Sequence, residues 1–206
     1  MDIARDVAQS ILATSARPGK ANKRRPAMAN AFYTIGHSKL SVAEFVGRLT
    51  SAGADFVVDV RAFPRSRSNP QFNAEALPQA LAAHGIGYEH VPELGGRRGR
   101  QADVCPERNA LWINSSFHNY ADYAEGAGFR AGFDRLVALG RDRRCAIMCA
   151  EAVWWRCHRR IIADYLISRG KRVLHIMPDG RIVPAKLTVG ARPRPDGTLV
   201  YPPTGL

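Results

Sequence analysis

The fold is indicated by residues 145–166, CAIMCAEAVWWRCHRRIIADYL, where a short apolar run precedes a turn rich in reactive side chains. The run Cys145–Cys149 is typical of a buried strand, and residues 161–166 have the apolar spacing of a helix packed on a sheet. Residues 149–160 contain two thiols, a carboxylate, an imidazole and three guanidiniums. Open α/β sheets bind ligands where a strand ends and a helix begins, so a site is expected here.

Length and composition predict one globular domain without a membrane span. The 206 residues are 46% hydrophobic, which is enough to bury a single core. No apolar run approaches the roughly 20 residues that cross a bilayer, and no signal-peptide pattern begins the chain. We therefore expect a cytoplasmic protein and no membrane partner. Four cysteines without CxxC spacing indicate reduced thiols and not a disulfide framework.

The formal net charge of +12 favours an anionic partner, because a positive field concentrates phosphates and other anions around the protein. The basic residues gather in three segments, residues 17–25, 97–100 and 141–144. Two interpretations stay open: a solvated, arginine-rich surface, and a surface that binds nucleic acid or another polyanion. The expected partner is thus an anionic small molecule or nucleic acid, and the sequence leaves the oligomeric state open.

The order of apolar segments predicts three regions: a flexible basic extension (residues 1–29), an α/β domain (30–180) and a Pro-rich C-terminal segment (181–206) that ends in a hairpin or trails off. Strands are expected at residues 32–35, 56–60, 87–91, 145–149 and 172–176. Helices are expected at 41–52, at 74–84, in two pieces over 117–139, and at 153–169. This alternation indicates a single three-layer α/β domain with a mostly parallel sheet of about five strands and helices on both faces.

Polar or titratable residues follow the expected strands. Gly36, His37 and Ser38 follow the first, Asp59 and Arg61 the second, Gly95 and Gly96 the third, and Cys149 and Glu151 the fourth, while His175 stands near the end of the fifth. Parallel strands bring such ends to one edge of the sheet, so these groups should form one site.

The same residues carry a family resemblance. The motifs are residues 34–38, residues 58–61 with Pro64 and Ser66, residues 71–73, residues 94–96, and Cys149-Ala150-Glu151 followed by Cys157-His158-Arg159. In these motifs the chain resembles domain-of-unknown-function family 488 over roughly residues 32–178. The resemblance implies a compact cytoplasmic α/β domain, but it implies no substrate because no reaction is attached to that family.

A weaker similarity connects the chain to rhodanese-like domains, in which Asp-Val-Arg follows an early strand and a cysteine lies between strand and helix. Asp59-Val60-Arg61 and Cys149 take comparable places here. The loop after Cys149 departs from that pattern, because it is not glycine-rich and Arg156 lies too far along for a Cys-x5-Arg phosphate cradle. The similarity is therefore an analogy of fold.

Cys149 is the leading candidate nucleophile, because a helix N-terminus and nearby arginines would lower the pKa of its thiol. A buried, purely structural cysteine is the alternative, and it is the interpretation favoured for Cys145. Glu151 is either a general acid/base or an ion-pair partner of Arg61 or Arg159. The expected catalytic residues are Cys149, Glu151, His158, His37 and Asp59, and the expected substrate-binding residues are Arg61, Ser66, Gly95, Gly96, Cys157 and Arg159.

No metal or other cofactor is expected. A zinc site from Cys149, Cys157 and His158 is disfavoured, since adjacent residues 157 and 158 should project from different sides of the backbone. A metal held by Asp59, Glu93 and Glu151 lacks any spacing signature. The Trp154-Trp155 pair is more typical of packing than of stacking on a base.

These observations favour an enzyme that acts on an anionic, nucleotide- or phosphate-containing substrate at the C-terminal edge of the sheet, with thiol chemistry. The alternative is a non-catalytic nucleic-acid-binding protein, accessory to DNA repair, in which the arginines bind phosphates and the cysteine motif is structural.

Overall fold

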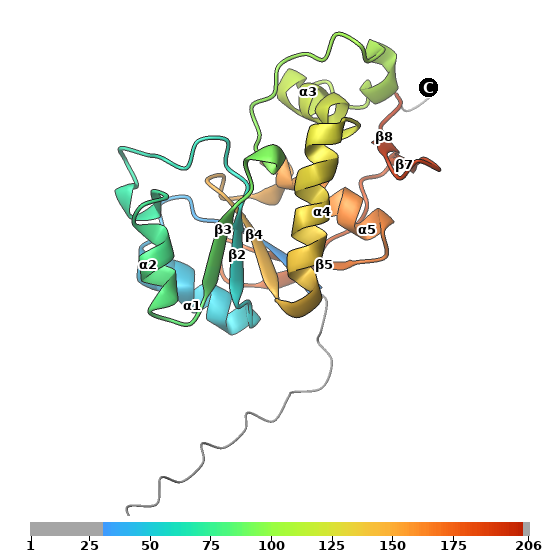
Figure 1. Cartoon of the computed structure of the whole chain (residues 1–206). Coiled ribbons are helices and arrows are strands. Elements are labelled where there is room, and N and C mark those ends of the chain that lie inside the picture. The colour runs from blue at the N-terminus through green and yellow to red at the C-terminus, as the bar shows by residue number, and fades with distance from the viewer. Residues whose placement is uncertain (1–30, 204–206) are drawn as a thin grey trace, which may run out of the picture.

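Six strands form one sheet in the order β3-β2-β4-β1-β5-β6 in the computed structural model, which describes residues 31–203 (Figure 1). The strands are β1 (Ala31–Gly36), β2 (Phe56–Asp59), β3 (Gly87–His90), β4 (Cys145–Cys149), β5 (Arg172–Ile176) and β6 (Ile182–Pro184). All neighbours pair in parallel except β5 and β6. The predicted mostly parallel α/β sheet is confirmed, and the predicted extension at residues 1–29 lies outside the described residues.

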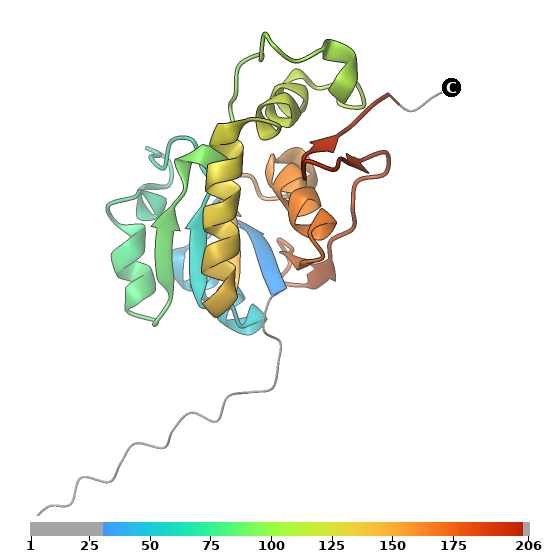
Figure 2. The ribbon, with the colours of Figure 1, turned by 45° about the vertical axis from the view of Figure 1, so that its right-hand side comes forward.

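Helices cover both faces of the sheet, as predicted (Figure 2). One face packs on α1 (Val42–Ala52) and α2 (Leu77–Ala82). The other packs on α4 (Ala127–Asp142) and α5 (Arg159–Ser168), and α3 (Ser115–Ala124) lies beyond the carboxyl ends of the strands. Adjacent strand residues divide between the two cores, because side chains alternate along a strand: Phe32 belongs to the second face and Tyr33 to the first.

A capping box begins α1. The Glu44 amide donates to the Ser41 hydroxyl, and the Glu44 carboxylate accepts from the Ser41 amide at 2.7 Å. Gly53 ends the helix in the left-handed region at φ 75°, a conformation that costs glycine little.

The helix predicted at residues 74–84 is shorter than expected, because α2 spans only Leu77–Ala82. Pro78 lacks an amide hydrogen and is accommodated in the first turn, where no intrahelical partner is needed. A 3₁₀ turn, Pro70–Phe72, precedes it, and two others, Pro92–Leu94 and Pro106–Asn109, follow later in the chain.

The prediction of a helix over residues 153–169 is wrong for the first residues of that range. A single 3₁₀ turn, Trp154–Arg156, is followed by Cys157 in an extended conformation (φ −137°, ψ 146°), and α5 begins only at Arg159. The amide of Cys157 bonds the oxygen of Trp154, which closes the turn instead of continuing it. Cys157, and not Cys149, therefore stands next to a helix N-terminus.

The C-terminal segment folds back on the domain. β6 forms an antiparallel hairpin with β5, and β7 (Arg192–Pro193) pairs with β8 (Leu199–Val200). Tyr201 is completely buried, and its hydroxyl lies 3.1 Å from the Asp164 carboxylate in α5. Among the helices of residues 31–203, none combines the length and apolar character that a bilayer crossing requires.

Candidate functional site

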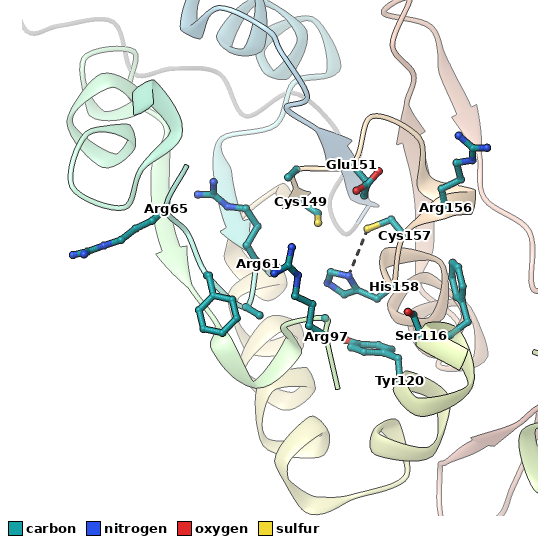
Figure 3. A pocket seen from close by; sticks show the side chains of 15 residues that line it. Arg61, Arg65, Arg97, Ser116, Tyr120, Cys149, Glu151, Arg156, Cys157 and His158 are labelled. Carbon is teal, nitrogen blue, oxygen red and sulfur yellow. Dashed lines mark hydrogen bonds between the residues drawn. The ribbon is translucent and has the colours of Figure 1, made fainter. Parts of the chain in front are cut away.

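The carboxyl ends of the three adjacent strands β2, β4 and β1 form the floor of the candidate site. Gly36 of β1 lies in register with Cys149 of β4, and Asp59 of β2 lies beside Met148. A pocket of about 340 Å³ opens above them (Figure 3). It is lined by Arg61, Ala62, Phe63, Arg65, Gly96, Arg97, Ser116, Phe117, Tyr120, Cys149, Ala150, Glu151, Arg156, Cys157 and His158.

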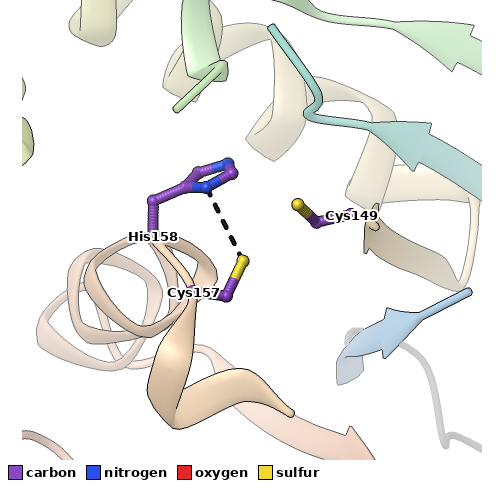
Figure 4. A group of neighbouring side chains, drawn as sticks. All are labelled: Cys149, Cys157 and His158. Atoms are coloured by element: carbon purple, nitrogen blue, oxygen red, sulfur yellow. Dashed lines mark hydrogen bonds between the residues drawn. The ribbon is translucent and has the colours of Figure 1, made fainter. Parts of the chain in front are cut away.

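Two sulfur atoms and an imidazole ring meet in this pocket. The Sγ atoms of Cys149 and Cys157 and a ring nitrogen of His158 all lie within 4.8 Å of one another (Figure 4). Cys149 comes from the end of β4, while Cys157 and His158 come from the turn before α5. The extended backbone at Cys157 lets these two adjacent side chains face the same space.

Cys157 has the contacts of a stabilised thiolate. Arg159 Nε donates to its Sγ at 3.2 Å, and His158 Nδ1 lies 3.6 Å from the same sulfur. Burial alone would raise the pKa of the Cys157 thiol, but the adjacent Cys149 thiol and the positive charge of Arg159 outweigh burial and hold this pKa well below its usual range.

His158 is held so that one chosen nitrogen faces the thiols. Its Nε2 lies 2.9 Å from the main-chain oxygen of Val60, which can only accept, so Nε2 carries a hydrogen and Nδ1 is directed at Cys157. Gly96 makes room for the ring, because a Cβ at this position would lie 2.7 Å from Nδ1. The ring of Tyr120 packs on the imidazole with centroids 4.9 Å apart.

Cys149 differs from the expectation in its electrostatics. The neighbouring Cys157 sulfur, together with burial, raises the pKa of the Cys149 thiol well above its usual range. The expected lowering by a helix N-terminus fails because α5 begins ten residues after Cys149, at Arg159. The more readily ionised thiol of this pair is thus Cys157. Cys145 lies in the core as predicted, and burial raises the pKa of its thiol to about 12.

Arg61 is fixed in the pocket wall by three buried groups. Its Nε and Nη2 donate to the Asp59 carboxylate, at distances down to 2.6 Å, and Nη2 also reaches the Phe72 oxygen. Its Nη1 lies 3.3 Å from Nε2 of His37, which stacks on the Phe72 ring. Burial lowers the pKa of His37 to about 4, and the charge of Arg61 adds to the shift, so this histidine is neutral near pH 7.

Asp59 and His37 therefore lie behind the pocket and not in its lining. The Asp59 carboxylate is completely buried and accepts from Tyr88 as well as from Arg61. Because its oxygen atoms are already occupied, its geometry is that of a group that positions Arg61.

Glu151 lies in the pocket lining, but its carboxylate forms no ion pair with Arg61 or Arg159. Arg159 is almost completely buried and donates instead to the main-chain oxygen of Glu151. This bond fixes the turn after β4 against α5. The Glu151 side chain is exposed at the pocket rim (Figure 3).

Ser66 and Gly95 lie outside the pocket lining. The Ser66 amide donates to the Asn73 side chain and its hydroxyl accepts from Asn69, so Ser66 shapes a loop. Gly95 packs against the main chain of Ala62, where a Cβ would come within 2.9 Å. Trp154 stacks on His175 with ring centroids 4.3 Å apart, which agrees with the packing interpretation, whereas Trp155 is exposed and does not follow it.

Sequence reasoning missed several lining residues. Ser116, Phe117 and Tyr120 reach the pocket from α3, and Phe63 and Arg65 reach it from the loop after β2. The basic segment at residues 97–100 was a signal for Arg97. Nothing in the local sequence marks the α3 residues, since their role depends on how α3 lies over the strand ends.

The cluster of Cys149, Cys157 and His158 could hold a thiophilic metal ion. The expectation that residues 157 and 158 project from different sides of the backbone is wrong, because both side chains face Cys149. Within the described part of the chain, it is the sole group of three or more His, Cys, Asp or Glu side chains placed to share a metal ion. Thiolate and imidazole are the donors that zinc prefers, and the Val60 oxygen would orient the imidazole from behind.

The comparison with protein families places the chain. The model described as Domain of unknown function DUF488 matches residues 41–166, more than half of the sequence. The matched range contains Cys149, Cys157 and His158 of the pocket. The chain belongs to this family. No curated protein and no solved structure was found to match it. Membership of the DUF488 family brings no reaction with it, so the chemistry has to be argued from the geometry of the pocket.

Proposed function

We propose that this protein is an enzyme that binds an anionic substrate in the pocket above the strand ends and attacks it with the thiolate of Cys157. The observation that carries the proposal is the position of the Cys157 sulfur, in contact with both Arg159 Nε and His158 Nδ1 at the base of an arginine-lined pocket. A cysteine paired with a histidine and a cation is the usual form of an activated thiol nucleophile.

The arginines support an anionic substrate. Arg97 and Arg156 line the pocket, and neither forms an ion pair with a carboxylate of residues 31–203. Arg61 is already neutralised by Asp59, and Arg65 pairs with Glu75 at 2.7 Å. Two guanidiniums are thus left to bind phosphate or carboxylate oxygen atoms, which their planar donor geometry favours. The nucleotide- or phosphate-containing substrate inferred from the sequence belongs to this class.

His158 would complete the chemistry. In the neutral tautomer set by Val60, Nδ1 accepts the proton of the Cys157 thiol. The thiolate then forms a bond to the electrophilic atom of the substrate, and the leaving group departs with its electron pair. The imidazolium returns the proton to that leaving group, so charge and protons balance.

The proposal can be tested by comparing two alkylating probes of different charge. Iodoacetate is anionic and iodoacetamide is neutral, and exposed Cys105 provides a reference thiol in the same molecule. For each cysteine, the labelling rate with iodoacetate is divided by the rate with iodoacetamide. At pH 6 we expect this ratio to be at least tenfold higher for Cys157 than for Cys105. The substitution Arg97→Gln should reduce this preference, and inorganic phosphate or pyrophosphate should protect Cys157 competitively.

The result also separates the enzyme from the nucleic-acid-binding alternative. If Cys157 shows no preference for the anionic probe and no protection by phosphate, the pocket is not an anion site. Steep salt-dependent binding to random DNA in that same protein would then favour the second interpretation, because phosphate neutralisation makes log affinity fall with log salt.

A further inference from the structure

We infer that Cys149 and Cys157 form a dithiol centre that exchanges with a disulfide, so that Cys149 is the resolving thiol and the anionic substrate is itself a disulfide. This inference rests on the proposed function, because it takes Cys157 as the attacking thiolate. It adds the class of the electrophile and a catalytic role for the second cysteine.

The closeness of the two sulfurs supports the inference. The Sγ atoms of Cys149 and Cys157 lie within 4.8 Å of each other, and both residues line the pocket. A disulfide requires a separation of about 2.05 Å, so the turn that carries Cys157 has to move toward Cys149 during the exchange. That turn is a 3₁₀ segment with an extended residue at its end, so it is less constrained than a continuous helix would be.

The other two cysteines are not placed for this reaction. Cys145 lies four residues before Cys149 at the opposite end of β4 and is completely buried. Cys105 is exposed in a loop, where its thiol bonds the Glu107 carboxylate at 2.8 Å. Only Cys149 and Cys157 therefore combine mutual contact with a position in the pocket lining.

The surroundings of the two thiols suit a two-step exchange. Cys157 attacks first, because its sulfur accepts from Arg159 Nε at 3.2 Å and lies 3.6 Å from His158 Nδ1, while Cys149 stands beside it as the second thiol of the pocket. Once Cys157 has become a mixed disulfide, its negative charge is gone. Without that charge beside it, the Cys149 thiolate forms more readily, and Cys149 can attack in turn.

The reaction balances in two displacements. The Cys157 thiolate attacks a substrate R–S–S–R, forming Cys157–S–S–R and releasing one RS⁻, which takes the proton held on His158. The Cys149 thiol then loses its proton to His158 and attacks the Cys157 sulfur, forming the Cys149–Cys157 disulfide and releasing the second thiol. The substrate disulfide is reduced by two electrons and the protein dithiol is oxidised by two. A low-molecular-weight thiol would return the protein to its dithiol form.

The pocket points to carboxylate-bearing disulfides. Arg97 and Arg156 supply guanidiniums at the pocket that can bind carboxylates, and Phe63 and Phe117 give apolar contact for the intervening carbons. The pocket volume of about 340 Å³ suits a small molecule and not a folded protein substrate.

The test uses three disulfides of similar size and different charge: dithiodipropionate, bis(hydroxyethyl) disulfide and cystamine. With the full-length wild-type protein, we expect dithiodipropionate to form the Cys149–Cys157 disulfide at least tenfold faster than the neutral compound, with cystamine slowest. Mass spectrometry should show the loss of two hydrogen atoms and no retained adduct. Peptide mapping should place the bond between these two cysteines.

Variants separate the two steps. Cys149→Ser should accumulate a mixed disulfide on Cys157, because the second displacement is lost, whereas Cys157→Ser should react far more slowly. Cys105→Ser is the matched control and should behave like the wild type. Cys149→Ala, checked by circular dichroism, guards against a folding defect specific to the serine variant.

Each outcome bears on the inference. If iodoacetate labels Cys157 rapidly but no disulfide forms with any of the three compounds, the dithiol inference is wrong and the proposed function stands. If the wild type retains a stable adduct as Cys149→Ser does, Cys149 is not the resolving thiol. If Cys157 reacts with neither type of probe, both proposals fall.

Discussion

The Nε2 atom of His158 lies 2.9 Å from the main-chain oxygen of Val60, and this contact determines which ring nitrogen faces Cys157. Val60 directly follows β2, whereas His158 directly precedes α5. The hydrogen bond therefore ties the end of one strand to the start of a distant helix and presents Nδ1 to the sulfur at 3.6 Å.

Replacing His158 should lower the reactivity of the Cys157 thiol without unfolding the protein. We expect His158→Asn to lower the rate of iodoacetate labelling at Cys157 by about 100-fold at pH 6, the usual scale for losing a positioned base. The pH dependence of labelling should also move toward the ordinary thiol range near 8.5. The measurement is peptide-resolved mass spectrometry with Cys105 as the reference. An unchanged pH profile would show that His158 has no part in activating Cys157.

Arg159 should matter to both stability and reactivity, since its buried guanidinium bonds the Cys157 sulfur and the Glu151 oxygen. Arg159→Met keeps much of the side-chain volume and removes the donors. We expect a loss of about 1.5–3 kcal/mol in the free energy of unfolding, as for hydrogen bonds that involve a charged group, together with a higher pKa of Cys157. Urea denaturation and the pH series of alkylation measure the two effects. Loss of stability with an unaltered alkylation profile would limit Arg159 to a structural role.

The loop glycines offer a matched pair of substitutions. A Cβ at Gly96 would lie 2.7 Å from His158 Nδ1, while a Cβ at Gly99 in the same loop meets nothing within 4 Å. Gly96→Ala should therefore displace the imidazole and reduce Cys157 labelling by tenfold or more, and Gly99→Ala should leave it unchanged. Equal effects of the two substitutions would mean that the loop acts through its flexibility and not through contact with His158.

A pH-dependent loss of stability is expected from the buried histidines. Burial lowers the pKa of His175 to about 4, and Arg159 adds to the shift, while Thr34 bonds its Nδ1 at 2.7 Å. Because the unfolded chain takes up the proton near pH 6.5 and the folded chain does not, this contribution is complete above that pH and is lost progressively as the pH falls toward 4.

The substitution His175→Asn isolates that contribution. Its free energy of unfolding should depend less on pH between 6.5 and 4 than that of the wild type, when both are measured by urea denaturation. His37 should make a similar contribution to the pH dependence of the free energy of unfolding, since burial lowers its pKa to about 4 as well. Parallel pH curves for the wild type and His175→Asn would show that His175 is protonated without cost in the folded state.

Much of the fold was predictable because its signals are local. The alternation of apolar segments predicted five of the six strands of the sheet and helices on both faces. The sixth strand, β6, was not assigned, because it has only three residues, Ile182–Pro184, of which the first and last are exposed and the last is a proline. A strand that short is defined by its pairing with β5 and not by its own pattern.

The sequence by itself also determined that reactive groups gather at the strand ends, since parallel strands must deliver them to one edge. Only the tertiary structure decided their roles. Nothing in the local pattern showed that the backbone becomes extended at Cys157, and this break turns Cys157 and His158 together toward Cys149. The acidity of each thiol then depends on contacts between segments far apart in the chain, Val60 with His158 and β4 with the turn before α5, because electrostatic effects follow distance in space and not separation in sequence.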